Sequence, residues 1–358
     1  MTDNLFVPNP YSMPQKEKEA SLLQRLISLT HHHRKQCIKY ARLMDLFYEG
    51  ITGFTKLSEI PHFTVNLFKT QKLLSIPDAE IFKVLQSSGT TSTHPSKIYL
   101  DSPTAQRQTM ALANIMTSLL GPQRLPMLVI DHPHVIHDRH SYSARGAAIV
   151  GMLTFGRNVF YAMDDNMQLD RKGIKEWLEK HQNQPILLFG LTFVIWEHFL
   201  SKLLDNEFTL PEAILMHTGG WKKLQEQAVS NDNFKEKLAQ LLGIQRCHNF
   251  YGMVEQIGSV FIECEKGHFH PPHFADIIIR HPKTWQECPI NESGVIQVLS
   301  ALPTSYPGHS LLTEDLGILL GIDDCPCGRK GKYFLVTGRV PQAEIRGCSD
   351  TYPFVSEA

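Results

Sequence analysis

The sequence lacks any long uncharged apolar run. No stretch approaches the roughly 18 consecutive apolar residues that a membrane-spanning helix requires, so we expect no membrane span. Residues 1–15 lack a basic region followed by an apolar core and therefore do not resemble a secretory signal. The seven cysteines are few and odd in number for a chain of 358 residues, which argues against a disulfide framework. These absences favour a cytoplasmic protein whose thiols are free for metal binding or chemistry.

The chain also lacks an excess of either charge. Its 35 lysines and arginines nearly balance its 36 aspartates and glutamates, which leaves a formal net charge of -1. No global field would attract nucleic acid, so any polyanion must be bound by local groups. The 42% of hydrophobic residues is ordinary for a globular protein, and the length exceeds what one core usually serves. We therefore expect a large domain accompanied by a smaller one.

Short strand-like runs alternate with helix-like segments along most of the chain. An amphipathic helix is predicted over residues 16–44, with the histidines of 31–33 on its solvated face. Strand-like runs follow in the order IFKVLQ, PMLVIDH, NVFYAM, PILLFGL, AILMHTGG and GIQRCHNFYG. This alternation predicts an α/β region over 1–260 with functional loops at the strand ends. The runs IECEKGHFHPP, ADIIIRHP, GVIQVLSAL and LGILLGI predict a β-rich subdomain over 261–337, before a short tail over 338–358.

A hydroxyl-rich loop after the first strand-like run is the strongest single motif. Residues 87–97 read SSGTTSTHPSK, which combines hydroxyls, a glycine and a lysine as polyphosphate binding requires. The loop is not a Walker A sequence, because GxxxxGK[ST] is absent. A plain polar connection explains the composition equally well. The phosphate-binding candidates are Ser87, Ser88, Gly89, Thr90, Thr91 and Lys97.

Further motifs follow this loop in a fixed order. They are Thr218-Gly219-Gly220, Asn249-Phe250-Tyr251-Gly252-Met253-Val254-Glu255, Thr313-Glu314-Asp315, and Gly338-Arg339 followed by Ile345-Arg346-Gly347. Each residue alone has an ordinary explanation: Tyr251 as a core residue, Glu255 as a solvated helix residue, Asp315 as a turn former, and Arg339 as a surface charge. The order and spacing of the motifs carry the functional interpretation.

Together with the hydroxyl-rich loop, these motifs resemble those of the adenylate-forming superfamily. The resemblance implies an acyl-CoA synthetase-like fold that binds ATP and Mg²⁺. It places Thr218, Gly219, Gly220, Tyr251 and Gly252 beside the adenine. It also implies that Glu255 helps to hold magnesium and that Asp315 binds the ribose hydroxyls. Arg339 begins a hinge element and is a candidate for both catalysis and nucleotide binding. The adenylation lysine of larger relatives has no counterpart that we can locate, which leaves Lys97 and Lys222 as candidates.

The sequence further resembles the acyl-protein synthetase family of the bacterial bioluminescence fatty-acid reductase complex. HTGGWK, NFYGMVEQ, ECEKGHFHPP, SYPGHSLLTEDLG and GRVPQAEIRGCSD carry this likeness over nearly the whole chain. It implies ATP-dependent activation of a long-chain fatty acid, a thioester on Cys348, and a hetero-oligomer with a fatty-acyl reductase and an acyl-transferase subunit. Two alternatives stay open: an acyl-CoA or acyl-carrier-protein ligase, and a non-catalytic nucleotide-binding subunit of a reductase complex.

Two clusters of metal-ligand residue types remain. Cys264, with His268 or His270, and the Cys325-Pro326-Cys327 pair could form a structural Cys₃His zinc site, and His270 is the preferred ligand because the prolines after it fix its backbone. Two unconnected turns with reduced cysteines explain the same residues. Phenylacetate-CoA ligase-like relatives carry a comparable site, so resemblance supports zinc. The loop 131–140, DHPHVIHDRH, is interpreted as a polar wall near the acyl or phosphate site.

Overall fold

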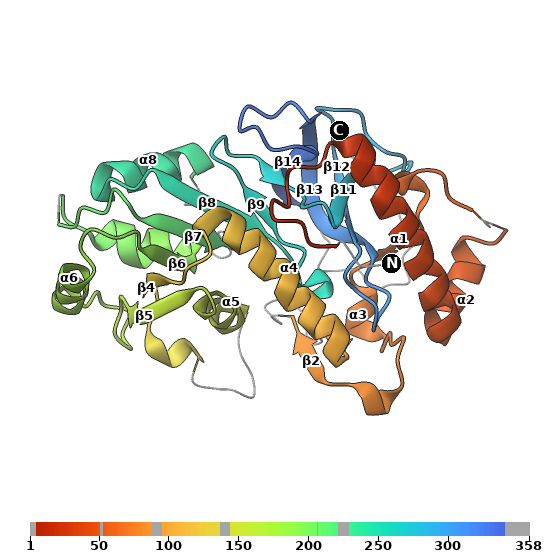
Figure 1. Ribbon diagram of the computed structural model, residues 1–358, viewed down its shortest axis with the longest axis horizontal. Coiled ribbons are helices and arrows are strands. Elements are labelled where there is room, and N and C mark those ends of the chain that lie inside the picture. The colour runs from red at the N-terminus through yellow and green to blue at the C-terminus, as the bar shows by residue number, and fades with distance from the viewer. Residues whose placement is uncertain are drawn as a thin grey trace, which may run out of the picture. The chain divides into compact units, whose positions relative to one another are not determined.

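The computed structural model describes residues 5–50, 53–87, 95–136, 144–205, 207–220 and 229–340 (Figure 1). The chain forms two compact units. The first comprises Met1–Ser118, Gly252–Phe261 and His268–Ala358, and the second comprises Leu119–Tyr251 and Ile262–Gly267. The first unit thus combines the N-terminal segment with the β-rich segment. The division of the chain into functional regions at about residues 260 and 337 stays a prediction.

Five parallel strands form the centre of the second unit. Their order is β5 (Gly156–Tyr161), β4 (Leu125–Val129), β6 (Leu187–Leu191), β7 (Ile214–Thr218) and β8 (Arg246–Tyr251). All five residues of β6 are buried, as expected for a parallel strand that is covered on both faces. These strands match the strand-like runs from PMLVIDH to GIQRCHNFYG, so the predicted α/β organisation is confirmed.

Helices pack around these strands and complete one hydrophobic core. Those that contribute buried residues to this core are α6 (Arg171–Lys180), α7 (Thr192–Val194) with its π-helical continuation Ile195–Phe199 and a 3-10 turn at Leu200–Lys202, and α8 (Asn231–Leu242). A further helix, α5 (Ala144–Leu153), packs against β5 and β6 (Figure 1). The ends of α8 follow simple rules. The Ser230 side chain accepts a hydrogen bond from the Asn233 N–H, and Gly243 ends the helix at φ +74°, which glycine adopts without strain.

Antiparallel strands dominate the first unit. Strands β11 (Ala275–Arg280), β12 (Ser293–Ser300), β13 (Ser310–Ile322), β14 (Lys332–Arg339) and β10 (Phe269–His270) pair in that order, and β1 (Phe63–Thr64) adds a parallel pair to β13. β2 (Lys83–Gln86) and β3 (Lys97–Leu100) form a separate hairpin. β9 (Phe261–Glu263) crosses the division between the units. The predicted β-rich character after residue 260 is confirmed.

The helices of the first unit are α1 (Gln15–Gln36), α2 (Ile38–Phe47), α3 (Leu67–Thr70) and α4 (Ser102–Leu120), with 3-10 turns at Leu57–Glu59, Asp78–Glu80 and Val254–Gln256. The single helix predicted over 16–44 is therefore divided, because Cys37 adopts an extended conformation between α1 and α2.

The prediction that the histidines of 31–33 lie on a solvated face was wrong at one position. His31 is exposed, whereas His33 is fully buried and stacks on His309 at 5.0 Å between ring centroids.

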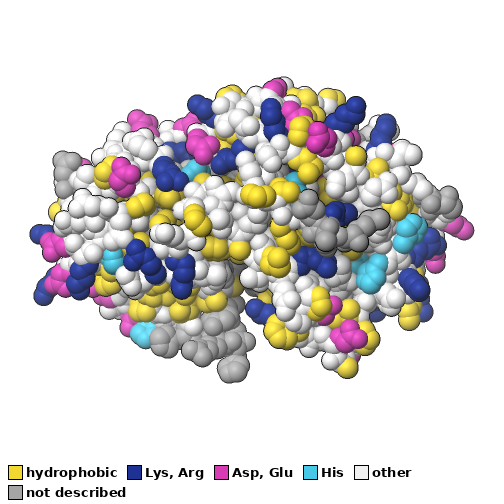
Figure 2. All heavy atoms as spheres, viewed as in Figure 1, with side chains coloured by type: hydrophobic (Ala, Val, Ile, Leu, Met, Phe, Trp, Pro, Cys, Tyr) yellow, Lys and Arg dark blue, Asp and Glu magenta, His cyan; other side chains and the backbone are white. Residues whose placement is uncertain are grey.

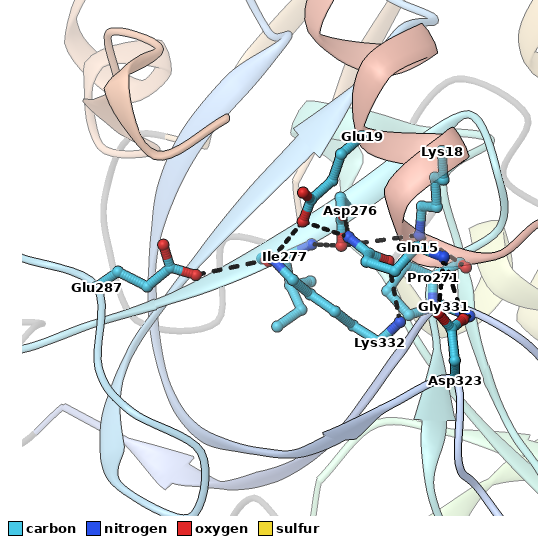
Figure 3. Close-up of polar contacts among 10 residues, drawn as sticks. All are labelled: Gln15, Lys18, Glu19, Pro271, Asp276, Ile277, Glu287, Asp323, Gly331 and Lys332. Carbon is cyan, nitrogen blue, oxygen red and sulfur yellow. Dashed lines mark hydrogen bonds and ion pairs between the residues drawn. The ribbon is translucent and has the colours of Figure 1, made fainter. Parts of the chain in front are cut away.

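Buried charges attach α1 to the sheet of the first unit (Figure 3). Lys18 and Asp276 are both buried, with Lys18 Nζ 3.7 Å from Asp276 Oδ1. Burial alone would raise the pKa of Asp276, but the ammonium groups of Lys18 and Lys332 lower it overall. Gln15 Nε2 donates to Asp276 Oδ2 over 2.7 Å. Because an unpaired buried charge is strongly unfavourable, these contacts fix the position of α1.

Basic and acidic side chains are interspersed on the face of the molecule in Figure 2, in keeping with the near-zero net charge. Among the described residues, no helix is both long and apolar enough for a membrane crossing.

Candidate functional site

The hydroxyl-rich loop is the connection of the β2–β3 hairpin. Gln86 pairs with Lys97 in the antiparallel register. Beyond that pair, the Ser87 N–H donates to the Ser96 carbonyl oxygen (3.0 Å), and the Ser96 N–H donates to Ser87 Oγ (2.8 Å). These bonds close the base of the loop, and Lys97 is exposed at its end. Four predicted phosphate ligands, Ser88, Gly89, Thr90 and Thr91, lie outside the described residues.

Glu255 lies in the 3-10 turn Val254–Gln256, which hydrogen bonds hold on both sides. Tyr306 Oη donates to the Glu255 carbonyl oxygen over 2.8 Å. The Gln256 side-chain amide donates to the carbonyl oxygens of Gly308 (2.8 Å) and Val298 (3.1 Å). Gln256 and Tyr306 are buried, so these bonds are protected from water. Glu255 is therefore positioned by a rigid turn, and it is not the solvated helix residue that its identity alone would suggest.

The Glu255 carboxyl is itself buried, with only 7% of the residue exposed. This burial raises the pKa of Glu255; the Ser96 hydroxyl and the Lys69 ammonium oppose the shift, and the Glu314 carboxylate adds to it. Ser96 Oγ has no hydrogen-bond partner of standard geometry in the described part of the chain. The Ser96 hydroxyl therefore influences the Glu255 carboxyl because it lies nearby, and not through a formed hydrogen bond. The carboxyl of Glu255 thus lies beside the base of the hydroxyl-rich loop.

The two charged neighbours of this carboxyl, Lys69 and Glu314, belong to a wider set of polar contacts. Lys69 Nζ lies 3.8 Å from Glu314 Oε1, and Asn66 Nδ2 donates to the same oxygen over 2.6 Å. Arg339 pairs with Glu314 (Nη2 to Oε2, 2.7 Å) and, more loosely, with Asp315 (Nε to Oδ1, 3.7 Å). Asp315 and Arg339 face each other in the β13–β14 register. The predicted residues Asp315 and Arg339 therefore lie together, next to the charges around Glu255.

Sequence reasoning missed two members of this cluster, Lys69 and Glu314. Glu314 was passed over because Asp315 beside it carries the motif resemblance. No local pattern distinguishes Lys69, whose contact with Glu314 joins segments far apart in the chain. Together the base of the loop, Glu255, Lys69, Glu314, Asp315 and Arg339 form one polar neighbourhood within the first unit. Their roles stay predictions.

The remaining predicted nucleotide ligands, apart from Gly252, belong to the second unit. Thr218 ends β7 and Tyr251 ends β8, so both lie at the carboxyl edge of the parallel sheet. Thr218 Oγ1 donates to the Phe250 carbonyl oxygen over 2.9 Å, which ties the two strand ends together. Gly219 has φ +82°, a left-handed conformation that a side chain would strain, and Gly220 follows it. This is the edge at which open α/β sheets bind ligands.

Three predicted zinc ligands come together in the first unit. The ligand atoms of His270, Cys325 and Cys327 all lie within 4.8 Å of one another, and Cys327 Sγ lies 3.4 Å from His270 Nε2. Burial, with a contribution from the Arg329 guanidinium, lowers the pKa of His270 to about 3, so its imidazole is neutral as metal binding requires. Cys264 belongs to the short segment of the second unit, where its carbonyl oxygen accepts from the Gly267 N–H (2.9 Å).

Cys348 and the residues around it lie outside the described part of the chain, as does Lys222. A cavity of about 410 Å³ in the first unit is lined by Lys16, Glu19, Lys56, Glu287, Lys332 and a mixture of polar and apolar neighbours. None of the predicted site residues in the described part of the chain lines it. We therefore place the candidate site by its chemistry and not by this cavity.

Comparisons with solved structures address the fold. A 2-hydroxyisobutyryl-CoA ligase in an open conformation, bound to 2-HIB-AMP and CoA, superposes with a TM-score of 0.66 over 96% of this chain and 80% of the other, at 17% identity. The same ligase in its postadenylation state gives a TM-score of 0.67 over 95% and 72%, also at 17% identity. At this identity the likeness concerns the fold alone, and it confirms the predicted acyl-CoA synthetase-like architecture.

Sequence comparisons address the family. A long-chain-fatty-acid–luciferin-component ligase of Vibrio harveyi is 22% identical over 348 residues, covering 96% of this chain and 89% of the relative. A ligase of the same name from Aliivibrio fischeri is 22% identical over 301 residues, covering 82% and 78%. The family described as acyl-protein synthetase, LuxE, matches residues 1–354. This chain therefore belongs to the LuxE family of acyl-protein synthetases, which confirms the predicted family and class of enzyme.

Proposed function

We propose that this enzyme uses ATP to activate a long-chain fatty acid as its acyl-AMP and then transfers the acyl group to its own Cys348. The names of the two Vibrio and Aliivibrio relatives support the substrate class. The observation that carries the proposal is the polar neighbourhood of the first unit, where the base of the hydroxyl-rich loop, Glu255 and the Asp315–Arg339 pair lie together. A nucleoside triphosphate needs hydroxyl, cationic and carboxylate groups of this kind.

In the first step the fatty-acid carboxylate attacks the α-phosphorus of ATP. A new P–O bond forms to the carboxylate while the bond to the departing pyrophosphate breaks. The loop of residues 87–97 would hold the phosphates by its hydroxyl and N–H groups, with Lys97 at its end. Asp315 would accept hydrogen bonds from the ribose hydroxyls, while Thr218, Gly219, Gly220, Tyr251 and Gly252 would contact the adenine.

Glu255 is the residue suited to Mg²⁺. Its carboxylate is buried at a cost that a nearby cation would offset, and one protein carboxylate plus water is a usual coordination for this ion. When bound, Mg²⁺ would neutralise charge on the phosphates as pyrophosphate leaves. The turn that Tyr306 and Gln256 hold would keep the Glu255 carboxylate in place for that role.

In the second step the Cys348 thiolate attacks the acyl carbonyl. The C–O bond to AMP breaks, AMP leaves, and the acyl group remains on the protein as a thioester. The described cysteines support this choice, because all except Cys327 are buried. Burial raises the pKa of Cys247 to about 12 and also raises the pKa of Cys288, so these thiols are poor nucleophiles at neutral pH. The thioester would serve a partner fatty-acyl reductase that makes aldehyde, in a cytoplasmic complex with an acyl-transferase subunit as a further candidate partner.

Fatty-acid-dependent exchange of labelled pyrophosphate into ATP tests the first step. We expect exchange with a long-chain fatty acid and Mg²⁺, and none when the acid or the metal is omitted, because exchange requires reversible acyl-AMP formation. Addition of CoA or an acyl carrier protein separates the alternatives. Turnover that continues only with such an acceptor would favour a ligase of that type. Complete absence of exchange would leave the non-catalytic subunit as the better explanation.

We also propose that Cys264 joins His270, Cys325 and Cys327 in a structural zinc site. Three ligand atoms are already close, and Cys264 is near His270 in the sequence. Two or more thiolates with a neutral imidazole form a typical tetrahedral zinc site. Zinc that completes the set would stabilise the turn after β13, whereas it has no part in the adenylation chemistry.

Cys325→Ser is expected to lose about one equivalent of tightly held zinc relative to wild type, and to lower the melting temperature, because structural zinc contributes directly to folding. Elemental analysis after gel filtration and a thermal melt measure both effects. Cys288→Ser provides the matched control, since Cys288 is buried in the same unit but outside the cluster. A wild-type protein with less than half an equivalent of zinc would contradict the site.

A further inference from the structure

A second group of metal-ligand side chains lies at the carboxyl edge of the second unit. His132 and His134 follow β4, and Asp165 follows β5. β4 and β5 are neighbouring parallel strands, so the loops that leave them emerge side by side. One ligand atom from each of these three residues lies within 4.8 Å of the other two. Neither the adenylation chemistry nor the cysteine cluster uses these residues.

The distances suit a small cation with nitrogen and oxygen ligands. His132 Nδ1 lies 3.8 Å from Asp165 Oδ1, and His134 Nδ1 pairs directly with the same carboxylate oxygen. Ligand bonds of about 2.0–2.1 Å in a tetrahedral zinc site separate the ligand atoms by roughly 3.4 Å. The side chains of His134 and Asp165 are 53% and 59% exposed, so they can adjust to such a geometry without disturbing the core.

His132 supplies an independent sign of an absent ligand. Its Nδ1 atom is buried from solvent and has no hydrogen-bond partner among the described residues. Its Nε2 atom lies 3.9 Å from Asp131 Oδ1, and Asp131 is fully buried and held by the Arg145 guanidinium. In the tautomer with hydrogen on Nε2, that hydrogen lies on the ring nitrogen near Asp131. The Nδ1 lone pair then faces the Asp165 carboxylate, an arrangement of two acceptors that a cation between them would stabilise.

Asp131 is the carboxylate nearest to the other ring nitrogen of His132, at 3.9 Å, which is close enough for a charge interaction but too long for a direct hydrogen bond. A metal-binding histidine usually directs its other ring nitrogen to a carboxylate or carbonyl group, which fixes both the tautomer and the orientation of the ring. The Arg145–Asp131 pair fixes the carboxylate in turn. We propose that His132, His134 and Asp165 bind one divalent transition-metal ion, with Zn²⁺ the first choice and water completing its coordination. Imidazole ligands favour Zn²⁺, Co²⁺, Ni²⁺ or Cu²⁺ over Mg²⁺.

This ion would connect the loop after β4 to the loop after β5. The site differs from the cysteine cluster in both place and ligand type, since it contains no sulfur. The sequence suggested that the loop 131–140 is a polar wall. The proposed site gives two histidines of that loop, His132 and His134, a metal-binding role.

Metal titration of the full chain tests the proposal. We expect His134→Ala and Asp165→Asn each to lose one equivalent of Zn²⁺, or to bind it at least about tenfold more weakly than wild type. The variants should fold normally, because both side chains are largely exposed. His31→Ala, which changes an exposed histidine of α1, should bind as wild type does. With Co²⁺ in place of Zn²⁺, the lost absorption should lack a sulfur-to-metal charge-transfer band.

Hydrogen exchange gives a readout that does not depend on stoichiometry. Added Zn²⁺ should slow amide exchange in residues 131–136 and 163–168 of wild type by at least about threefold, since cross-linked loops open less often. The same addition should have no effect there in Asp165→Asn. Equal zinc binding by wild type, His134→Ala and Asp165→Asn would overturn the proposal. So would an equal loss in His31→Ala, because the histidines would then bind metal only nonspecifically.

Discussion

Cys348→Ser is expected to abolish the hydroxylamine-sensitive acyl label that the wild-type chain acquires from labelled fatty acid and ATP. A serine hydroxyl is far less ionised than a thiol at neutral pH, so it does not replace the thiolate as a nucleophile without an activating base. The first step does not use the thiol. Single-turnover release of pyrophosphate should therefore continue at close to the wild-type rate while the label on the protein falls to background.

Cys288→Ser is the matched control for this experiment. Cys288 is buried, and burial raises the pKa of its thiol, which disfavours the nucleophilic form. The variant should keep the full label on a denaturing gel. Label that persists in Cys348→Ser would reject Cys348 as the acyl carrier. Loss of label in both variants would indicate a general effect on the protein and would not support the assignment.

Glu255→Gln is expected to slow acyl-AMP formation by roughly 10²–10³-fold, with a raised requirement for Mg²⁺. The substitution keeps the shape of the side chain but removes the negative charge that would hold the metal at the phosphates, and losses of this size are typical for one charge-stabilising group. Pyrophosphate exchange measured over a range of Mg²⁺ concentrations gives both quantities. Glu49→Gln, an exposed glutamate of the same unit, should leave them unchanged.

Stability separates this functional loss from misfolding. Burial raises the pKa of Glu255 in the folded state, so the native protein binds that proton more tightly than the unfolded chain does. The ionised carboxylate therefore lowers stability as pH rises above the ordinary glutamate pKa, and it does so fully above the folded pKa. Glu255→Gln should melt at the same temperature as wild type or higher at pH 7. Wild-type exchange in this variant would remove Glu255 from the magnesium role.

The two substitutions also distinguish the two half-reactions. Cys348→Ser should keep pyrophosphate release and lose the thioester. Glu255→Gln should slow both in proportion, because acyl-AMP forms too slowly to supply Cys348. A thioester that forms at the normal rate in Glu255→Gln would mean that acylation does not depend on the proposed metal ligand.

Local patterns in the sequence predicted the second unit well. Parallel strands covered on both faces appear as continuous apolar runs, so PILLFGL and AILMHTGG could be recognised as β6 and β7. The position of Thr218 and Tyr251 at strand ends follows from the same pattern. The ordered motifs predicted the family, because each occupies a separate place along almost the whole chain.

Contacts between distant segments could not be predicted in this way. Lys69 meets Glu314, and Lys18 meets Asp276, across long stretches of chain that carry no shared pattern. His33 is buried against His309, which directly precedes β13 and is remote in the chain, so the triple histidine looked solvated in the sequence. The unpartnered nitrogen of His132 is likewise visible only once Asp131 and Asp165 lie around it.

The sequence alone determined the α/β class, the order of the strands along the chain, the family and most candidate residues, because apolar periodicity and motif chemistry are local properties. Only the tertiary structure decided that the base of the hydroxyl-rich loop, Glu255 and the Asp315–Arg339 pair share one neighbourhood. It also decided that Glu255 is desolvated and that two loops bring His132, His134 and Asp165 together. Burial and charge pairing depend on residues that are remote in the chain, and only folding places those residues within a few ångströms of one another.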